Sequence, residues 1–422
     1  MNRRRNTRRR ENIIPGVDNK IFYGVLIAST IIILICLSIW YRKNEINKDK
    51  VVLESKKIND EVEQIYSEAN NEIGSTDSYK TDKILRVSFV GDIASGAKIE
   101  NNNVNYDSIF SDAKEELKDA DIAIGTYSSN VKTANEKEFA KSVYNSGVDL
   151  LSIATYSGNA GAQDVDEKEQ NLREIGFDTV GHYDDSEEDR VKIVERRDVK
   201  IAVIAYTVDS SSNSSKSKVN LYDSAKAKED LEYAKENAKF TIVMLNWKSS
   251  QGGMKTKQEE NIANELVSNG ANAVIGTNSN CLQSLEMVQG ENGQSFIAYS
   301  SGNYFSEISN ENSKLELILN MQIYIDKDGK TEIYKIDYTP MYMYDNSKSS
   351  EGQNRFKILN IKQEISNYEK KQEEINNQAN VDDQEIINSL TDTDTKTNVD
   401  GKTYKKLKIG IDRIRKILGI QN

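Results

Sequence analysis

Between residues 83 and 346, short apolar runs alternate with stretches of helical spacing, and this alternation constrains the fold more than any other feature of the chain. The runs expected to form strands are 84–90, 121–124, 148–154, 200–206, 240–245, 273–275 and 295–299, and the expected helices are 107–119, 136–146, 166–175, 222–237 and 257–268. Two further strands, 315–325 and 331–338, are expected to pair antiparallel about a turn at 326–329. Strands that alternate with helices in this way predict an α/β domain built from βαβ units.

Functional side chains in α/β folds gather on the loops that follow the carboxyl ends of the strands. Six segments, most of them on such loops, lie in unbroken order between residues 84 and 345: Phe89-Val90-Gly91-Asp92, residues 121–128, residues 146–157, Asn246-Trp247-Lys248, residues 270–283, and Tyr299-Ser300-Ser301-Gly302-Asn303-Tyr304. Together they resemble the CapA family, proteins linked to poly-γ-glutamate capsule synthesis. The resemblance implies a metallophosphatase-like αββα sandwich.

The chain departs from the family pattern at the positions that supply the family's metal ligands. Asp92 is retained, but Ser128 stands where the family has Glu, and Tyr156 and Ser157 replace an Asn–His pair. The family's remaining His ligands are replaced by Asn246, Thr277, Asn278 and Asn280. One carboxylate with neutral amides and hydroxyls cannot supply the charge that holds a dinuclear transition-metal centre. By resemblance the chain is a pseudoenzyme, and we expect no catalytic residue, metal or cofactor.

A degenerate ligand pocket is expected at these positions, formed by Asp92, Ser128, Tyr156, Ser157, Asn246, Trp247, Asn278 and Asn280. Asp92 is the one retained candidate metal ligand. It either binds a hard cation or caps the turn after its strand. The asparagines either bind a polyamide or glycan or have drifted after loss of a metal. Trp247 either stacks on a ligand or belongs to the core. His182, the only histidine, matches no family ligand.

An uncharged apolar run, Ile21–Trp40, precedes the domain and is long enough to cross a bilayer as a helix. Residues 1–20 carry seven Lys and Arg against two Asp and Glu, a net charge of +5. By the positive-inside rule this tail is cytoplasmic, residues 21–41 form a single transmembrane helix, and the main domain is extracytoplasmic at the cell membrane. The alternatives are a cleaved signal peptide, for which no small-residue cleavage site follows the run, and a buried core helix.

The segments that flank the domain are polar and charged. Residues 42–82 read as a stalk and linker with a thin heptad-like seam at Ile58, Val62, Ile65 and Ala69, which either pairs two copies into a homodimer or is solvated. Residues 347–400 read as a charged helix and a polar linker. Residues 401–422 read as a basic amphipathic helix. That helix either meets an anionic membrane, polymer or partner, or folds back on the domain.

Composition narrows the function further. The 422 residues carry a net charge of −11, which argues against a nucleic-acid partner. The two cysteines, Cys36 and Cys281, form no disulfide framework or metal motif. We therefore expect a membrane-anchored, non-catalytic accessory protein in the synthesis or export of a capsule or envelope polymer. By resemblance its partners are an anionic polymer, poly-γ-glutamate first, and the polymer's synthase complex. The alternative is an active metal-dependent hydrolase or transferase with a histidine-free site rebuilt around Asp92.

Overall fold

The computed structural model describes residues 84–96, 104–155, 162–183, 190–208, 218–247, 253–307, 310–346, 355–378 and 399–419. All of them belong to one compact unit, Tyr79–Asn422. The predicted cytoplasmic tail, transmembrane helix and stalk (1–82) lie outside the described residues, as do most of the predicted linker and the site residues Tyr156 and Ser157. Within the described ranges, no helix is both long and apolar enough to span a bilayer.

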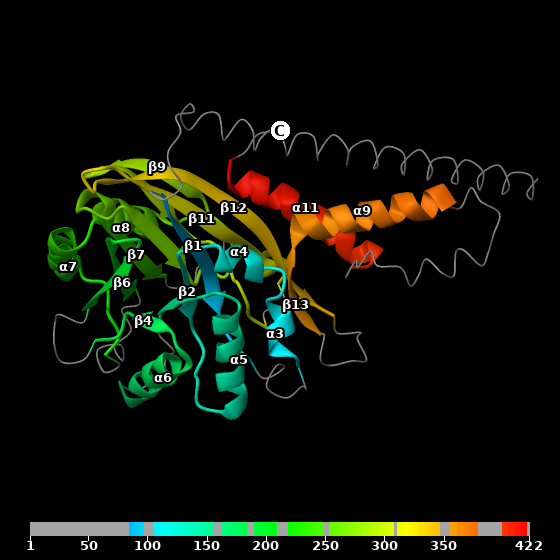
Figure 1. Ribbon diagram of the computed structural model, residues 1–422, viewed down its shortest axis with the longest axis horizontal. Coiled ribbons are helices and arrows are strands. Elements are labelled where there is room, and N and C mark those ends of the chain that lie inside the picture. Colours follow the sequence, from blue (N-terminus) through cyan, green and yellow to red (C-terminus); the bar gives the residue numbers. More distant parts are fainter. Residues whose placement is uncertain are drawn as a thin grey trace, which may run out of the picture. The chain divides into compact units, whose positions relative to one another are not determined.

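The first of two sheets contains seven strands in the order β13-β12-β11-β1-β2-β3-β4 (Figure 1). Strands β1 to β4 run parallel, whereas β11 pairs antiparallel with both β1 and β12, and β12 pairs antiparallel with β13. The strands are β1 (Ile84–Ile93), β2 (Ile122–Tyr127), β3 (Leu150–Ser152), β4 (Asp178–Val180), β11 (Leu315–Ile325), β12 (Thr331–Asp345) and β13 (Phe356–Asn360).

The second sheet contains six strands in the order β5-β6-β7-β8-β10-β9. Its central strands β6, β7, β8 and β10 are parallel, and each edge strand pairs antiparallel with its neighbour. The strands are β5 (Val191–Arg196), β6 (Val199–Thr207), β7 (Phe240–Asn246), β8 (Ala273–Thr277), β9 (Leu285–Gly290) and β10 (Gly293–Ala298).

Alternating side chains fill the space between and outside the two sheets. On β6, Ile201 and Val203 share one buried cluster with Leu85 and Phe89 of the first sheet, while Ile204 packs outward. Because successive side chains of a strand point to opposite faces, a strand buried on both sides is apolar throughout. The outer faces are covered by α3 (Tyr106–Ile109), α4 (Lys114–Lys118), α5 (Ala134–Asn145) and α6 (Ala162–Ile175) on the first sheet, and by α7 (Ser224–Asn237) and α8 (Lys257–Ser268) on the second. The layers are helix, sheet, sheet, helix, which confirms the predicted α/β class.

Several elements differ from the expectation. The single helix predicted over 107–119 is two short helices, α3 and α4, separated by a turn. The short or half-exposed strands β4, β5 and β9 carry too weak an apolar pattern to be predicted. The charged run after 355 begins as a strand, because Phe356, Ile358 and Leu359 are buried where β13 extends the first sheet. The sheet therefore continues past residue 346, the predicted end of the domain.

The C-terminal helices fold back on the sheets. Helix α9 (Ile361–Gln378) contacts α11 (Gly401–Ile417), and both contact β12 (Figure 1). Leu407 and Ile414 of α11 are buried in the same apolar cluster as the inner faces of the two sheets, and the rings of Tyr368 and Tyr404 stack with their centroids 4.4 Å apart. The apolar stripe of the basic helix is thus part of the core. Of the two alternatives for residues 401–422, the structure has the one in which the helix folds back on the domain.

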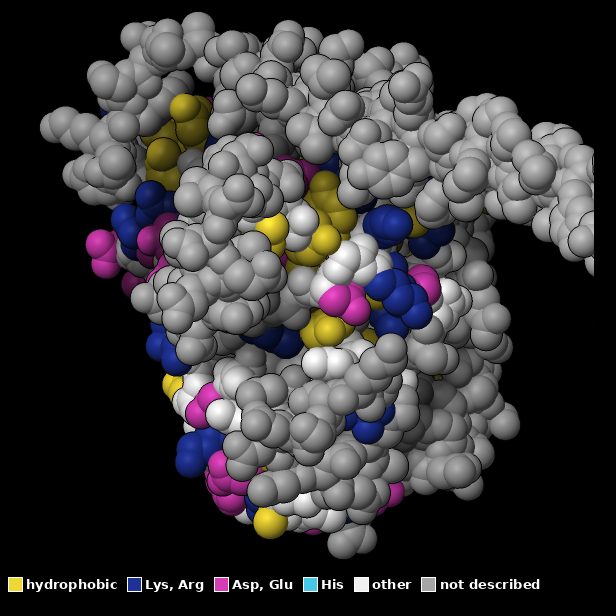
Figure 2. Space-filling model, turned by 90° about the vertical axis from the view of Figure 1, so that its right-hand side faces the viewer, with side chains coloured by type: hydrophobic (Ala, Val, Ile, Leu, Met, Phe, Trp, Pro, Cys, Tyr) yellow, Lys and Arg dark blue, Asp and Glu magenta, His cyan; other side chains and the backbone are white. Residues whose placement is uncertain are grey.

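Many cations on the described surface lie beside carboxylates. On the face in Figure 2, Lys and Arg side chains lie next to Asp and Glu side chains and to a central apolar patch. Arg355 donates to Asp345 at 2.8 Å, and Lys357 pairs with Asp112 at 2.8 Å. A described Lys or Arg that has no carboxylate partner is therefore a candidate for binding an external anion.

Candidate functional site: the polar edge of the two sheets

Three parallel strands of each sheet carry a buried polar residue at or next to their carboxyl end, and these ends form one edge, here called the polar edge. Its members at the strand ends are Asp92, Thr126 and Ser152 in the first sheet and Thr207, Asn246 and Thr277 in the second, each a register partner of its neighbour. Parallel strands place their carboxyl ends at the same border of a sheet. Because a hydrogen bond joins Asp92 to the segment after β8, the borders of the two sheets meet here.

Asp92, at the end of β1, is the centre of the polar edge and is only 5% exposed. Its Oδ2 accepts a hydrogen bond from the backbone N–H of Asn278 at 2.5 Å, and its Oδ1 accepts from the Ser128 hydroxyl at 3.3 Å. Burial raises the pKa of Asp92 to about 6, and the two hydrogen bonds partly oppose the shift. Both carboxylate oxygens therefore have protein partners, and the surroundings disfavour the charged form.

Asn278 closes the polar edge from the second sheet. It adopts the left-handed conformation (φ +66°), which Asn tolerates better than most residues. Its side-chain amide donates to Asn246 Oδ1 at 3.1 Å and to the Trp247 carbonyl at 2.8 Å. Asn246 and Asn278, two of the predicted pocket residues, thus bond to each other, and Asn278 also bonds to the backbone.

Trp247 belongs to the core and is 2% exposed. Its indole Nε1 donates to the Tyr299 carbonyl at 2.8 Å, so its polar atom is satisfied inside the protein. Gly276 allows this packing, because a Cβ there would lie 2.1 Å from both Trp247 Nε1 and Tyr299 O. Trp247 was expected either to stack on a ligand or to belong to the core, and in the structure it belongs to the core.

Glu316 is a buried carboxyl near Asp92 that the sequence did not single out. It lies on β11, is 1% exposed, and accepts a hydrogen bond from the Gly91 backbone N–H at 2.9 Å. Burial holds the pKa of Glu316 well above its usual range, and the charge of Asp92 raises it further. Glu316 lies between Leu315 and Leu317 on a strand with an alternating pattern, so the sequence suggests that it is exposed. Only its burial in the structure identifies it as a candidate site residue.

Asn280 lines a neighbouring pocket. It also has a positive φ (+56°) and is half-buried. Met254 and Leu282 line the same pocket, and Asp92 is not among its described lining residues. Of the eight predicted site residues, Asp92, Ser128, Asn246 and Asn278 come together, Trp247 packs beneath them and accepts through its backbone carbonyl, and Asn280 lies in the next pocket.

The comparisons with known proteins agree with this scaffold. The model of a family described as "Bacterial capsule synthesis protein PGA_cap" matches residues 86–307, just over half of the chain. The chain belongs to this family. The sequence resemblance to CapA proteins is thereby confirmed.

Individual relatives of this capsule synthesis family member are remote. "Capsule biosynthesis protein CapA" of Bacillus anthracis is 22% identical over 256 residues, which cover 54% of this chain and 61% of that protein. The crystal structure of a hypothetical protein from Thermus thermophilus has a TM-score of 0.41 and 13% identity, covering 61% of this chain and 98% of that one. A 5'-nucleotidase from Candida albicans has a TM-score of 0.37 and 10% identity, covering 60% and 50%. Both TM-scores are below 0.5, so neither structure bears on the chemistry of this chain.

The polar edge of this capsule synthesis family member does not suit a dinuclear transition-metal centre. Its donors are the carboxyls of Asp92 and Glu316, both with raised pKa values, and amides and hydroxyls. Among the described residues, no three His, Cys, Asp or Glu side chains are placed to hold a metal ion. A transition metal would need a charged or imidazole-rich ligand set, which these side chains do not offer.

Two further buried groups lie near the ends of β2, β3 and β4. Lys168 of α6 donates to the Tyr127 carbonyl at 2.6 Å and to the Thr155 hydroxyl at 3.2 Å, and burial lowers the pKa of Lys168 to about 7. His182 Nδ1 lies 2.5 Å from Glu169 Oε2, and Nε2 lies 2.8 Å from Asp166 Oδ1 without hydrogen-bond geometry. His182 is thus held between two carboxylates of α6, away from the residues bonded to Asp92.

Proposed function

We propose that this protein is a membrane-anchored accessory protein of capsule or envelope polymer synthesis or export, and that it performs no metal-dependent turnover. Family membership supports the role in capsule synthesis. The apolar run Ile21–Trp40 and the basic residues before it support a cytoplasmic N-terminus, a single span and an extracytoplasmic domain.

The partners follow from the same role. An anionic polymer, with poly-γ-glutamate as the first candidate, and the membrane complex that synthesises it are the proposed partners. The seam at Ile58, Val62, Ile65 and Ala69 would pair two copies through the stalk. The four layers of helices and sheets are consistent with a metallophosphatase-like scaffold that now serves binding or assembly.

The observation that carries the non-catalytic part is the closure of Asp92. Both oxygens of the only retained ligand are bonded to the protein, at Asn278 and Ser128. A carboxylate whose lone pairs cap a neighbouring segment is a structural group. The competing function, a hydrolase or transferase around Asp92, would have to bind a cation with the lone pairs that these two bonds leave, at a carboxyl whose burial disfavours the charged form.

Genetic rescue in the bacterium that encodes the chain tests the proposal. Deletion of the gene should reduce surface polymer, and the wild-type gene should restore it. An Asp92→Asn variant that accumulates to the wild-type level in the membrane fraction should restore it equally, because the side chain keeps its shape, its oxygen can accept from the Asn278 N–H, and its NH2 group can donate to the Ser128 hydroxyl oxygen. Failure of that variant at equal abundance would favour the hydrolase.

Metal content provides an independent measurement. The purified full-length protein, from cells supplied with manganese, zinc, iron and calcium, should hold no more metal than Asp92→Ala. One or more metal ions per chain in the wild type, lost in Asp92→Ala, would contradict the proposal that the protein is a pseudoenzyme.

A further inference from the structure

A second polar region lies beside the polar edge, in a partly open pocket of about 820 Å³. It is bordered by residues 253–255 before α8, the loop 279–284 after β8, the segment 310–313 that enters the short helix η4 (Glu311–Lys314), and the end of α11. Its volume falls in the range of about 300–1,000 Å³ that is common for small-molecule sites. The family match ends at residue 307, so two of the four walls come from outside the matched region.

The charge of the pocket is opposite to that of the chain. Lys255, Arg413 and Lys416 line it, and none of the described lining residues is Asp or Glu. The whole chain has a net charge of −11. A concave surface of one sign attracts and concentrates ligands of the other sign.

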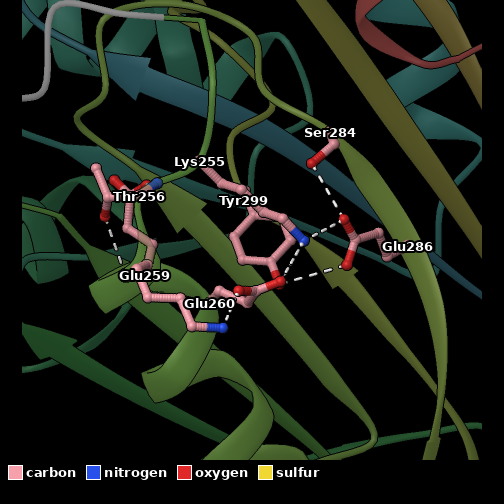
Figure 3. A network of polar contacts seen from close by, with 8 residues as sticks. Lys255, Thr256, Glu259, Glu260, Ser284, Glu286 and Tyr299 are labelled. Atoms are coloured by element: carbon pink, nitrogen blue, oxygen red, sulfur yellow. Dashed lines mark hydrogen bonds and ion pairs between the residues drawn. The ribbon is translucent and has the colours of Figure 1, made fainter.

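Lys255 is already neutralised by the protein. Figure 3 shows its ammonium between Glu286, Glu260 and the Tyr299 hydroxyl. The Nζ atom lies 2.5 Å from Glu286 Oε1 and 3.2 Å from Glu260 Oε1, and it also lies over the Tyr299 ring at 4.5 Å. Lys255 therefore fixes this wall, and its charge is compensated within the protein.

Arg413 and Lys416 are different. Arg413 donates to the neutral amide oxygen of Asn312, which leaves the guanidinium charge uncompensated. No ion pair joins Arg413 or Lys416 to a carboxylate of the described residues, whereas Lys406 and Arg415 on the same helix both have one. Positions three apart share one face of a helix, and both of these cations line the pocket.

The rest of the lining matches amides and short apolar groups. Asn280, Asn310 and Asn312 line the pocket with side-chain amides. The oxygens of Asn310 and Asn312 already accept from the Asn312 backbone N–H and from Arg413, so these two side chains offer N–H donors, which pair with carboxylate and amide oxygens. Met254, Leu282 and Ile417 supply apolar surface between them. A guanidinium binds a carboxylate through two parallel hydrogen bonds, and an ammonium binds it as a point charge.

We propose that this pocket binds a ligand carrying at least two carboxylates joined by amide bonds, with one carboxylate at Arg413 and one at Lys416. Two cations and three amides suit an acidic amide chain better than a polyphosphate, which would bring more charge than the pocket can compensate. The ligand is an acidic chain rather than a free small acid. The ligand class rests on the proposed function, whose polymer is an acidic amide chain, whereas the place of the site rests on the pocket lining, so the site can fail while the capsule role stands.

Titration calorimetry on the purified full-length protein in detergent tests the proposal. The probes are end-blocked triglutamate, end-blocked triglutamine and N-acetylglutamate. Triglutamate should bind, with an affinity that falls as salt rises, and triglutamine should bind at least tenfold more weakly. Triglutamate should bind at least tenfold more weakly to Arg413→Gln/Lys416→Gln.

The matched control is Lys402→Gln/Lys405→Gln, which removes the same charge from the same helix at residues that do not line the pocket. It should bind triglutamate like the wild type. Equal loss in both double variants would show a non-specific charge effect and overturn the site. Absence of triglutamate binding would overturn it as well.

Two further results would overturn the ligand class. N-acetylglutamate binding as tightly as triglutamate would remove the need for chain-linked carboxylates and point to a small acid. Tripolyphosphate binding more tightly than triglutamate, with the same loss in Arg413→Gln/Lys416→Gln, would replace carboxylates with phosphates. The rescue experiment on Asp92 is unaffected by either result, so failure of this proposal and failure of the proposed function are distinguishable.

Discussion

The polar edge and the neighbouring pocket share one loop, and they use their polar groups in opposite ways. Asn278 begins the loop and bonds inward to Asp92, Asn246 and Trp247. Two residues later Asn280 lines the open pocket with Arg413 and Lys416. At the polar edge the carboxylate is buried and bonded, whereas in the pocket two cations line the opening without an ion pair to a described carboxylate.

This difference indicates where binding energy remains available. A buried polar group that is bonded within the protein stabilises the fold, and a ligand would have to compete with those bonds. An unpaired charge in an open pocket is solvated and can bind an incoming group. Substitutions at the polar edge should therefore change stability, and substitutions in the pocket should change binding.

The largest expected effect on stability is that of Trp247→Ala. Removal of a fully buried indole should lower the free energy of unfolding by about 3–5 kcal/mol, because the cavity cannot fill. Denaturant unfolding followed by circular dichroism measures the loss. Trp247→Phe, which keeps a ring and loses the bond to Tyr299, should lose less. Full stability in Trp247→Ala with loss of polymer would instead make Trp247 a ligand-stacking residue.

Asp92→Ala should cost about 1–3 kcal/mol, because the Asn278 N–H loses its acceptor in a buried place. The same unfolding measurement applies. Ser128→Ala is the matched control and should cost less, since its 3.3 Å bond is long and the variant leaves Asp92 bonded to Asn278. A stable Asp92→Ala protein would indicate that the polar edge is open rather than closed.

Lys168 predicts a pH dependence of stability. Burial lowers the pKa of the folded state to about 7 from 10.5, so between these values the unfolded chain binds more protons than the folded one. Stability should therefore rise with pH across this window, with a slope of up to about 1.4 kcal/mol per pH unit from this group. Lys168→Met should lose this part of the slope, and Lys141→Met, at an exposed lysine, should keep it. Parallel slopes in Lys168→Met and the wild type would show that the ammonium is not desolvated.

The smallest effect on stability is expected in the pocket. Arg413→Gln/Lys416→Gln should change the free energy of unfolding by no more than about 0.5 kcal/mol, as surface substitutions usually do. Thermal unfolding of the ligand-free protein measures it. A larger loss would mean that the two cations hold α11 in place, and the contrast between edge and pocket would disappear.

The apolar pattern predicted most of the fold, because strands buried on both faces and amphipathic helices carry strong periodic signals. The prediction failed for elements with a weak apolar pattern, whose burial depends on partners far away in the sequence. Strand β13 is an example, since Phe356 and Ile358 lie within a charged run and become core only because β12 is beside them. Helix α11 is another, because its apolar stripe suits a membrane as well as a sheet, and only the burial of Leu407 and Ile414 in the core cluster decides between them.

The candidate site was predicted in part for the same reason. Strand ends brought Asp92, Ser128, Asn246 and Asn278 together, as the topology of parallel strands requires. Glu316 was missed because a Glu between two leucines looks exposed on an alternating strand, although it bonds to Gly91. The pocket was missed because its walls come from four segments between residues 253 and 417.

By itself, the sequence determined which residue types stand at each strand end. It also determined the α/β class, because strand and helix periods are local properties of the chain. Only the tertiary structure decided that the carboxylate of Asp92 is closed while Arg413 and Lys416 line an open pocket. Hydrogen-bond partners and unpaired charges depend on which distant segments meet, and that is settled by packing.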